Sequence, residues 1–304
     1  MSDDPYNVPG IDNTDIDHII KAEGYGGKVR AMAIKTTATC AEAAKIHKTS
    51  SVVTAALGRF MTGSLLISSD MKNETDTQTT IIKADGPIGG MTCVCDFGYK
   101  VRAYPVNADV ETTYHRPGKI DVGSAVGEGM LTIIRDIGLK EPYVGSVELL
   151  SGEIAEDFAY YLARSEQTKS VVALGVAIKD GEVTNAGGLM VQLLPSADDD
   201  IIDRLEARAS GFPDITYLME EGFTPAKIID LFLGDPELQY LSAEPVSFFC
   251  PCSMEKMSRG LITLGKTELE DLAKTPEGID TECHFCGSKY HFTKEDIEGL
   301  LQTL

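Results

Sequence analysis

The order of apolar and polar residues along the first two-thirds of the chain predicts strands and helices in an irregular succession. Strands are predicted where apolar and polar residues alternate or where a short apolar run is continuous, at 28–36, 79–83, 92–106, 171–179 and 189–194. Helices are predicted where the composition or the spacing of apolar residues is typical of a helix, at 39–48, 52–67 and 154–165. No regular strand–helix–strand order is visible, so we expect the α+β class, with a mixed β-sheet core and packed helices.

The pattern changes after Pro195, where short acidic helices replace strands. Asp198–Asp200 favours a helix start, and Thr224-Pro225 supplies an N-cap followed by proline at the first helical position. The second of these helices is expected to end near Gly234. Short helices of this kind are marginal alone and depend on docking to a neighbour. We therefore interpret residues 196–245 as a helical linker whose stability is conditional.

The end of the chain carries start signals for several short elements. Ser253 is a candidate N-cap for one helix, Thr267-x-x-Glu270 matches a capping box for a second, and Thr293-x-x-Asp296 opens a third. A hairpin is predicted before the third helix, at residues 282–292. The expected organisation is a flexible leader at 1–16, a core domain at 17–195, the linker at 196–245 and a small C-terminal domain at 246–304.

The net charge of the chain limits the kinds of molecule that it can bind. The 304 residues include 47 Asp and Glu against 27 Lys and Arg, a net charge of −20, and residues 196–304 alone hold 22 acidic and 9 basic residues. Nucleic acid and anionic membranes both require a basic footprint, so we exclude both as main partners. No apolar run approaches the roughly 18 residues of a membrane span. The acidic N-terminus is unlike a signal peptide, and a cytoplasmic location is expected.

Four of the seven cysteines crowd the last 55 residues. An odd number of cysteines without an export signal disfavours a stable disulfide framework and favours metal or redox chemistry. Cys250-Pro-Cys252 and Cys283-His-Phe-Cys286 form two close pairs that are separated by 30 residues. Two such pairs on separate turns can place four sulfurs about 2.3 Å from one tetrahedral Zn²⁺. We therefore predict one zinc ion held by all four cysteines.

The same four cysteines are compatible with other chemistry. Cys250 with Cys252 and Cys283 with Cys286 can form two local disulfides, which would remove every metal ligand. These residues alone are also compatible with a zinc site that is purely structural, or with a thiol–disulfide oxidoreductase that uses Cys283 and Cys286. A zinc-ribbon nucleic-acid-binding or translation-associated factor is a third alternative, although residues 246–304 carry 10 acidic against 6 basic residues. The sequence contains no catalytic constellation, so we do not expect an enzyme.

Several segments resemble the heat-shock protein 33 family of redox-regulated chaperones. The resemblance rests on Cys-Pro-Cys, Cys-His-Phe-Cys and the following Lys-Tyr-His-Phe, and on core segments at 85–90, 118–167, 172–176 and 187–195. It implies a reduced, zinc-bound, inactive monomer whose zinc ligands are Cys250, Cys252, Cys283 and Cys286. It further implies that Cys283 and Cys286 sense the oxidant first, after which the linker unfolds and Cys250 and Cys252 oxidise. Zinc release, homodimer formation and ATP-independent holding of unfolding client proteins complete the implied activity.

The chain departs from this family pattern at three places. The leader at 1–16 has no counterpart, and we assign it no role. Cys93 and Cys95 lie on a predicted core strand, where alternation places both sulfurs on one face too far apart for an easy disulfide. They are predicted to be buried, inert thiols. Cys40 lies in a predicted helix, and a structural role is expected for it.

Overall fold

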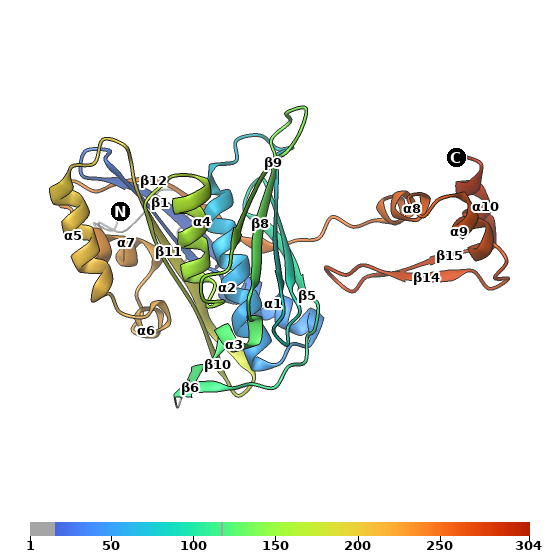
Figure 1. Ribbon diagram of the computed structural model, residues 1–304, viewed down its shortest axis with the longest axis horizontal. Helices are drawn as coiled ribbons and strands as arrows, with labels where there is room; N and C mark the ends of the chain where they lie inside the picture. The colour runs from blue at the N-terminus through green and yellow to red at the C-terminus, as the bar shows by residue number, and fades with distance from the viewer. Residues whose placement is uncertain (1–15, 117) are drawn as a thin grey trace. The chain divides into compact units, whose positions relative to one another are not determined.

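The computed structural model describes residues 16–116 and 118–304, which fall into two compact units divided between Phe248 and Phe249 (Figure 1). The predicted leader lies outside the described residues except for Ile16. The predicted start of the C-terminal domain, residue 246, is three residues earlier than this division. The reason is that β13 (Ser247–Phe248) pairs in parallel with β5 (Lys100–Pro105) and so belongs to the first unit.

The first unit contains two large sheets and several helices. Its other strands are β1 (His18–Gly24), β2 (Val29–Lys35), β3 (Thr77–Ala84), β4 (Met91–Asp96), β6 (Tyr114–Arg116), β7 (Lys119–Ile120), β8 (Gly129–Asp136), β9 (Tyr143–Glu148), β10 (Ser170–Lys179), β11 (Glu182–Leu193) and β12 (Gln239–Pro245). Its helices are α1 (Thr37–His47), α2 (Ser51–Ile67), the 3₁₀ turn η1 (Ser68–Asp70), α3 (Val122–Val126), α4 (Ala155–Ser165), α5 (Asp199–Ser210), α6 (Ile215–Glu220) and α7 (Pro225–Leu233).

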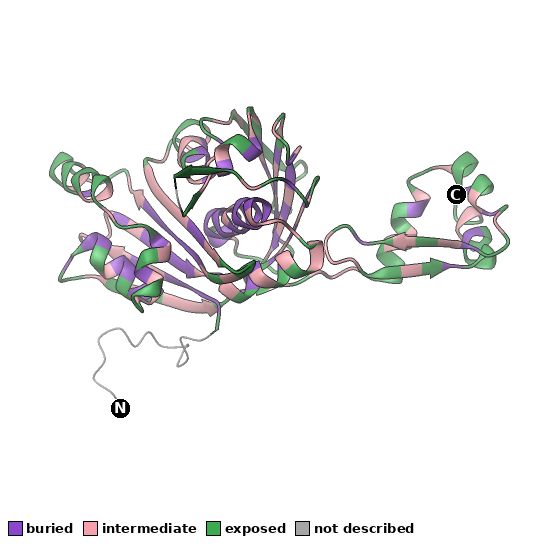
Figure 2. Cartoon of the chain, turned by 90° about the horizontal axis from the view of Figure 1, so that it is seen from below, coloured by how far each residue is buried: buried purple, intermediate pink, exposed green. Residues whose placement is uncertain are grey.

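The two sheets enclose α2. One sheet has the strand order β10-β11-β2-β1-β12 and is antiparallel throughout, and the other has the order β13-β5-β4-β3-β8-β9. Figure 2 shows α2 between them as a buried helix, and fifteen of its seventeen residues are buried. Strands from both sheets share one core with α1, α2, α3 and α4, which confirms the predicted α+β class.

Small residues on α2 allow its neighbours to approach closely. A Cβ atom added at Gly63 would lie 2.3 Å from the ring of Phe158 in α4, and one added at Gly58 would lie 2.8 Å from Val176 in β10. Real Cβ atoms essentially never show such contacts, so glycine is required at both positions for this packing. The ring of Phe158 also stacks on that of Phe60 in α2, with ring centroids 6.2 Å apart.

The apolar character of α2 extends into η1. By length and composition the stretch Ser51–Asp70 could cross a membrane, with a mean hydropathy of 1.3 in its apolar window, and 89% of that window is buried inside the fold. Burial of this extent is expected of a core helix. The sequence expectation concerned an uninterrupted apolar run, and Arg59 with several hydroxyl residues interrupts this segment, although its average is apolar.

The outer face of the five-stranded sheet is covered by α5, α6 and α7. Alternate residues of β2 separate the two sides of this sheet: Met32 and Ile34 face the α2 core, whereas Ala31 and Ala33 face the three outer helices. The helices contribute a second set of buried apolar residues, Leu205, Ile215, Leu218, Ala226, Ile228, Ile229, Phe232 and Leu233. The segment predicted as a linker is therefore docked on the sheet in this structure.

This segment also contains a strand that the sequence did not reveal. β12 pairs antiparallel with β1 along its length, from His18 opposite Pro245 to Glu23 opposite Gln239. The helices of residues 196–245 end at Leu233, next to the predicted end near Gly234, and the helical description of this segment is corrected for Gln239–Pro245. β1, β8 and β9 were also missed. In β8, Leu131 and Ile133 are buried at alternate positions, but the neighbouring Met130 and Ile134 are apolar as well and hide this alternation in the sequence.

The second unit is small. Its elements are α8 (Met254–Ile262), α9 (Lys266–Leu272), β14 (Ile279–Glu282), β15 (Lys289–Phe292) and α10 (Lys294–Leu301). Ser253 caps α8 and Thr293 with Asp296 forms a capping box for α10, as predicted. The capping box at Thr267 was wrong, because α9 already begins at Lys266 and Gly265 occupies its N-cap position with a φ of 91°. The core consists of five buried residues, Leu261, Leu269, Ala273, Phe292 and Ile297, and the partly buried side chains around them.

Candidate metal centre

Two turns of the second unit present the four predicted cysteines. Cys250 and Cys252 lie in the extended segment that precedes α8, and the Ser253 cap fixes the start of that helix directly after them. Cys283 and Cys286 lie in the turn between the paired strands β14 and β15. Within this turn the Gly287 N–H donates to the Cys283 carbonyl at 2.8 Å, and Gly287 has a φ of 68° that favours glycine.

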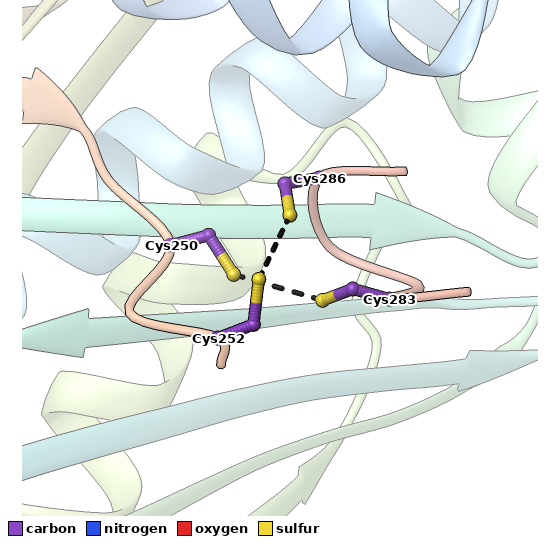
Figure 3. A group of neighbouring side chains, drawn as sticks. All are labelled: Cys250, Cys252, Cys283 and Cys286. Atoms are coloured by element: carbon purple, nitrogen blue, oxygen red, sulfur yellow. Dashed lines mark hydrogen bonds between the residues drawn. The ribbon is translucent and has the colours of Figure 1, made fainter. Parts of the chain in front are cut away.

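The four sulfurs converge on one point. All four lie within 4.8 Å of one another, with 3.7 Å between Cys250 Sγ and Cys283 Sγ and 3.3 Å between Cys252 Sγ and Cys286 Sγ (Figure 3). Four thiolates placed tetrahedrally at about 2.3 Å from one metal ion have sulfur separations of about 3.8 Å. All four cysteines are unpaired thiols. The four sulfurs and their spacing therefore fit one tetrahedral ion. The structure brings together the four cysteines that the sequence predicted to converge.

The thiols of the cluster differ in acidity. Burial raises the pKa of Cys250 and Cys283. Burial also opposes ionisation of Cys252, but hydrogen bonds from the Tyr290 hydroxyl and from neighbouring thiols outweigh it and lower the pKa of Cys252 to about 7. The metal-free cluster therefore holds protons on at least Cys250 and Cys283 at pH 7, and a metal ion has to displace them.

Tyr290 is a contributor to the site that the sequence prediction missed. Its hydroxyl donates to the Cys252 sulfur at 3.1 Å, and this bond is the main reason why the pKa of Tyr290 is raised to about 12. The only signal in the sequence was the position of Tyr290 on a hairpin strand next to the second cysteine pair. His291 Nδ1 lies 2.9 Å from Asp280 Oδ1, and His291 is not among the residues whose ligand atoms converge at the cluster.

The three remaining cysteines lie in the first unit. Cys40, Cys93 and Cys95 are each at most 2% exposed, and all three are unpaired. Cys93 and Cys95 share the buried face of β4, as the alternation predicts. Burial raises the pKa of Cys40 to about 12 and raises that of Cys95 as well. Because the thiolate is the reactive form, burial and raised pKa values agree with the prediction of inert thiols.

Comparisons with known proteins agree with the fold and identify the family. The family model described as Hsp33 protein matches residues 17–293. The chain belongs to the Hsp33 family. It is 42% identical to the 33 kDa chaperonin of Ruminiclostridium cellulolyticum and 41% identical to that of Bacillus subtilis, each alignment covering 94% of this chain and 98% of the relative.

A solved structure supports the same assignment. The crystal structure of the 33 kDa chaperonin, or heat shock protein 33 homolog, from Thermotoga maritima superposes with a TM-score of 0.86 at 32% identity, covering 94% of this chain and 98% of that one. Hsp33 is a family of chaperones, and membership implies that unfolded proteins are the clients. The resemblance that the cysteine motifs indicated is thereby confirmed.

Proposed function

We propose that this protein is a redox-regulated, ATP-independent holdase that is inactive when reduced and zinc-bound and is activated by oxidation. The observation that carries this proposal is the cluster of four reduced cysteines in a chain of the Hsp33 family. In this proposal the active form binds unfolding client proteins and prevents their aggregation, without enzymatic turnover. The reduced protein is a cytoplasmic monomer and the oxidised protein a homodimer.

Zinc is the metal we assign to the cluster. Four thiolates in tetrahedral spacing are the usual donor set for structural Zn²⁺, which has no redox chemistry of its own. When bound, the ion supplies folding free energy to the second unit and keeps its thiols ionised. Cys250, Cys252, Cys283 and Cys286 would hold it, and the Tyr290 hydroxyl would donate a hydrogen bond to the Cys252 sulfur.

Oxidation removes the ligands in pairs. Attack of one cysteine sulfur on a peroxide gives a sulfenic acid and releases water or an alcohol, and its neighbour then displaces a second water as the disulfide forms. Each pair loses two electrons to one peroxide. We assign the first disulfide to Cys283 and Cys286 and the second to Cys250 and Cys252. The sulfur contacts at 3.7 and 3.3 Å instead join Cys250 to Cys283 and Cys252 to Cys286, so both disulfides require the cluster to rearrange.

The docked segment of residues 196–245 suits the role of an unfolding sensor in this proposal. It contains 12 acidic and 3 basic residues, so its own charges repel one another. Chain continuity links it to the cluster, since Cys250 follows β13 by two residues. Loss of the metal would therefore release the chain next to β13 and β12, and undocking of α5–α7 would expose the apolar face of the five-stranded sheet to clients.

The decisive experiment measures zinc, thiols and chaperone activity in one sample. Zinc and free thiols are counted before and after treatment with peroxide under mild heat, while suppression of client aggregation is assayed. We expect release of one zinc, loss of four thiols and a gain of holdase activity, with Cys250–Cys252 and Cys283–Cys286 disulfides found by peptide mapping. The Cys93→Ala variant is the matched control and should respond like the parent. Full activity in the reduced, zinc-loaded protein would contradict the proposal.

Zinc affinity is expected to fall steeply as the pH decreases. Cys250 and Cys283 carry raised pKa values, so each must release a proton when the metal binds near pH 7. Release of two or more protons lowers the affinity at least about 100-fold for each pH unit below 7. Competition with a chromophoric chelator of known pH dependence measures this slope. A slope of one proton or less would show that the thiols are already ionised in the metal-free protein.

A further inference from the structure

A second group of metal-binding side chains lies in the first unit, away from the cysteines in the chain. His115 of β6, Asp121 before α3 and Glu153 before α4 each offer one ligand atom, and these three atoms lie within 4.8 Å of one another. His115 Nε2 is 3.1 Å from Asp121 Oδ1 and 3.2 Å from Glu153 Oε1. Three separate segments of the chain therefore direct one imidazole nitrogen and two carboxylate oxygens toward a common point.

The two carboxylates are held in place by further hydrogen bonds. Asp121 Oδ1 accepts from the Ser124 backbone N–H at 3.0 Å, and its Oδ2 accepts from the Ser124 hydroxyl at 2.7 Å. Glu153 Oε1 accepts from the Gly123 N–H at 3.1 Å, while Arg59 binds the opposite oxygen, Oε2, at 2.6 Å. Outer contacts of this kind orient metal ligands. Arg59 occupies only the far side of Glu153, so Oε1 faces His115.

The backbone before α4 is also fixed. Ile154 follows Glu153 directly and has a φ of 75°, a strained conformation for a β-branched residue. The buried carboxylate of Asp157 holds this turn, because it accepts from the Ile154 N–H at 2.8 Å and from the Leu150 N–H at 2.7 Å. Glu153 is therefore presented by a rigid turn, which is the support that a preorganised ligand requires.

The observed distances suit a metal ion. Ligand atoms about 2.1 Å from one ion, at angles between octahedral and tetrahedral, are about 3.0–3.4 Å apart, which brackets the two measured separations from His115. His115 and Glu153 also border an open groove of about 1420 Å³ along β10, so water can complete the coordination shell.

We propose that His115, Asp121 and Glu153 form a binding site for a divalent first-row transition-metal ion, distinct from the cysteine cluster and independent of the proposed redox function. One imidazole and two carboxylates suit Mn²⁺ or Fe²⁺ and can also bind Zn²⁺, but they do not suit a soft ion such as Cu⁺. The bound ion joins β6 to the start of α3 and to the turn before α4. It thereby fixes the β6–β7 hairpin at the rim of the groove.

Titration with Mn²⁺ tests this site in the full-length, reduced and zinc-loaded protein. Mn²⁺ is the probe because it binds carboxylates in preference to thiolates. Electron paramagnetic resonance also measures the concentration of the free ion directly. We expect one saturable Mn²⁺ per chain. The His115→Gln and Asp121→Asn variants should each bind at least tenfold more weakly, and the asparagine retains an oxygen that can cap α3.

The matched control is His291→Gln in the second unit. His291 is likewise an exposed histidine bound to a carboxylate, that of Asp280, but it has only this one acidic partner among the described residues. Its replacement should leave Mn²⁺ binding unchanged. The proposal is overturned if the parent protein shows no saturable Mn²⁺ binding, or if both His115→Gln and Asp121→Asn, shown to be folded by circular dichroism, bind like the parent. In either case His115 is a hydrogen-bonding partner of the two carboxylates and no more.

Discussion

Removal of zinc is expected to unfold residues 249–304 and to leave the α2 core of the first unit folded. The core of the second unit has only five buried apolar residues, Leu261, Leu269, Ala273, Phe292 and Ile297, of which Leu261 and Ala273 are still 9% exposed. A core of this size is not sufficient for independent stability. A Cys₄ zinc ion contributes about 10–16 kcal/mol of binding free energy to small domains at neutral pH. Without it, the segment before α8 and the β14–β15 turn lose the link between them.

Nuclear magnetic resonance measures this outcome residue by residue. After chelation under reducing conditions, amide signals from 249–304 should collapse to random-coil positions, and they should return when zinc is added back. Cys283→Ala should produce the same collapse without a chelator. His284→Ala is the matched control, since His284 lies between two ligands and the four sulfurs already complete the shell. A dispersed spectrum for the metal-free second unit would refute the role assigned to the ion.

Phe232→Ala is expected to loosen the outer helices and to give holdase activity without oxidation. Phe232 of α7 is 1% exposed, belongs to the buried apolar layer between the helices and the five-stranded sheet, and packs edge to face against Phe212 with ring centroids 5.0 Å apart. Truncation of a buried phenylalanine costs about 3–5 kcal/mol. Short acidic helices that depend on docking have little stability to lose, so α5–α7 should detach before the α2 core unfolds.

Hydrogen exchange and an aggregation assay on the reduced, zinc-loaded variant test both parts of this expectation. Amides of residues 199–233 should exchange markedly faster than in the parent, whereas those of α2 should not. Leu231→Ala is the matched control, because Leu231 is on the same helix but 41% exposed. Faster exchange without any holdase activity would separate the docking of these helices from the proposed regulation.

Interactions between residues close in the chain are the ones that the sequence predicts well. Side-chain capping signals such as Ser253 and the Thr293–Asp296 box act within four residues, and both were predicted. The capping-box prediction at Thr267 failed although its residues are present, because Gly265 is the N-cap of α9 and Lys266 is already the first helical residue. The burial of Cys93 and Cys95 followed from the period of two along a strand, which is a local property as well.

Elements that depend on a distant partner were not predictable in this way. β12 is a strand because β1, more than 200 residues earlier in the chain, offers it an unpaired edge, and its own burial pattern shows no clear alternation. The contact of Tyr290 with Cys252 likewise requires the hairpin to fold back on the first cysteine pair. Neither interaction leaves a local signature in the sequence.

The sequence by itself determined the family, the α+β class and the four cysteines of the metal centre, because the spacing of each pair is a covalent constraint that survives any arrangement of the chain. Only the tertiary structure decided that the acidic segment is docked and ends in a core strand. Tertiary structure alone also brought His115, Asp121 and Glu153 together. Their spacing in the chain is irregular, and their proximity results from the packing of a hairpin and two helix starts, which no short-range pattern encodes.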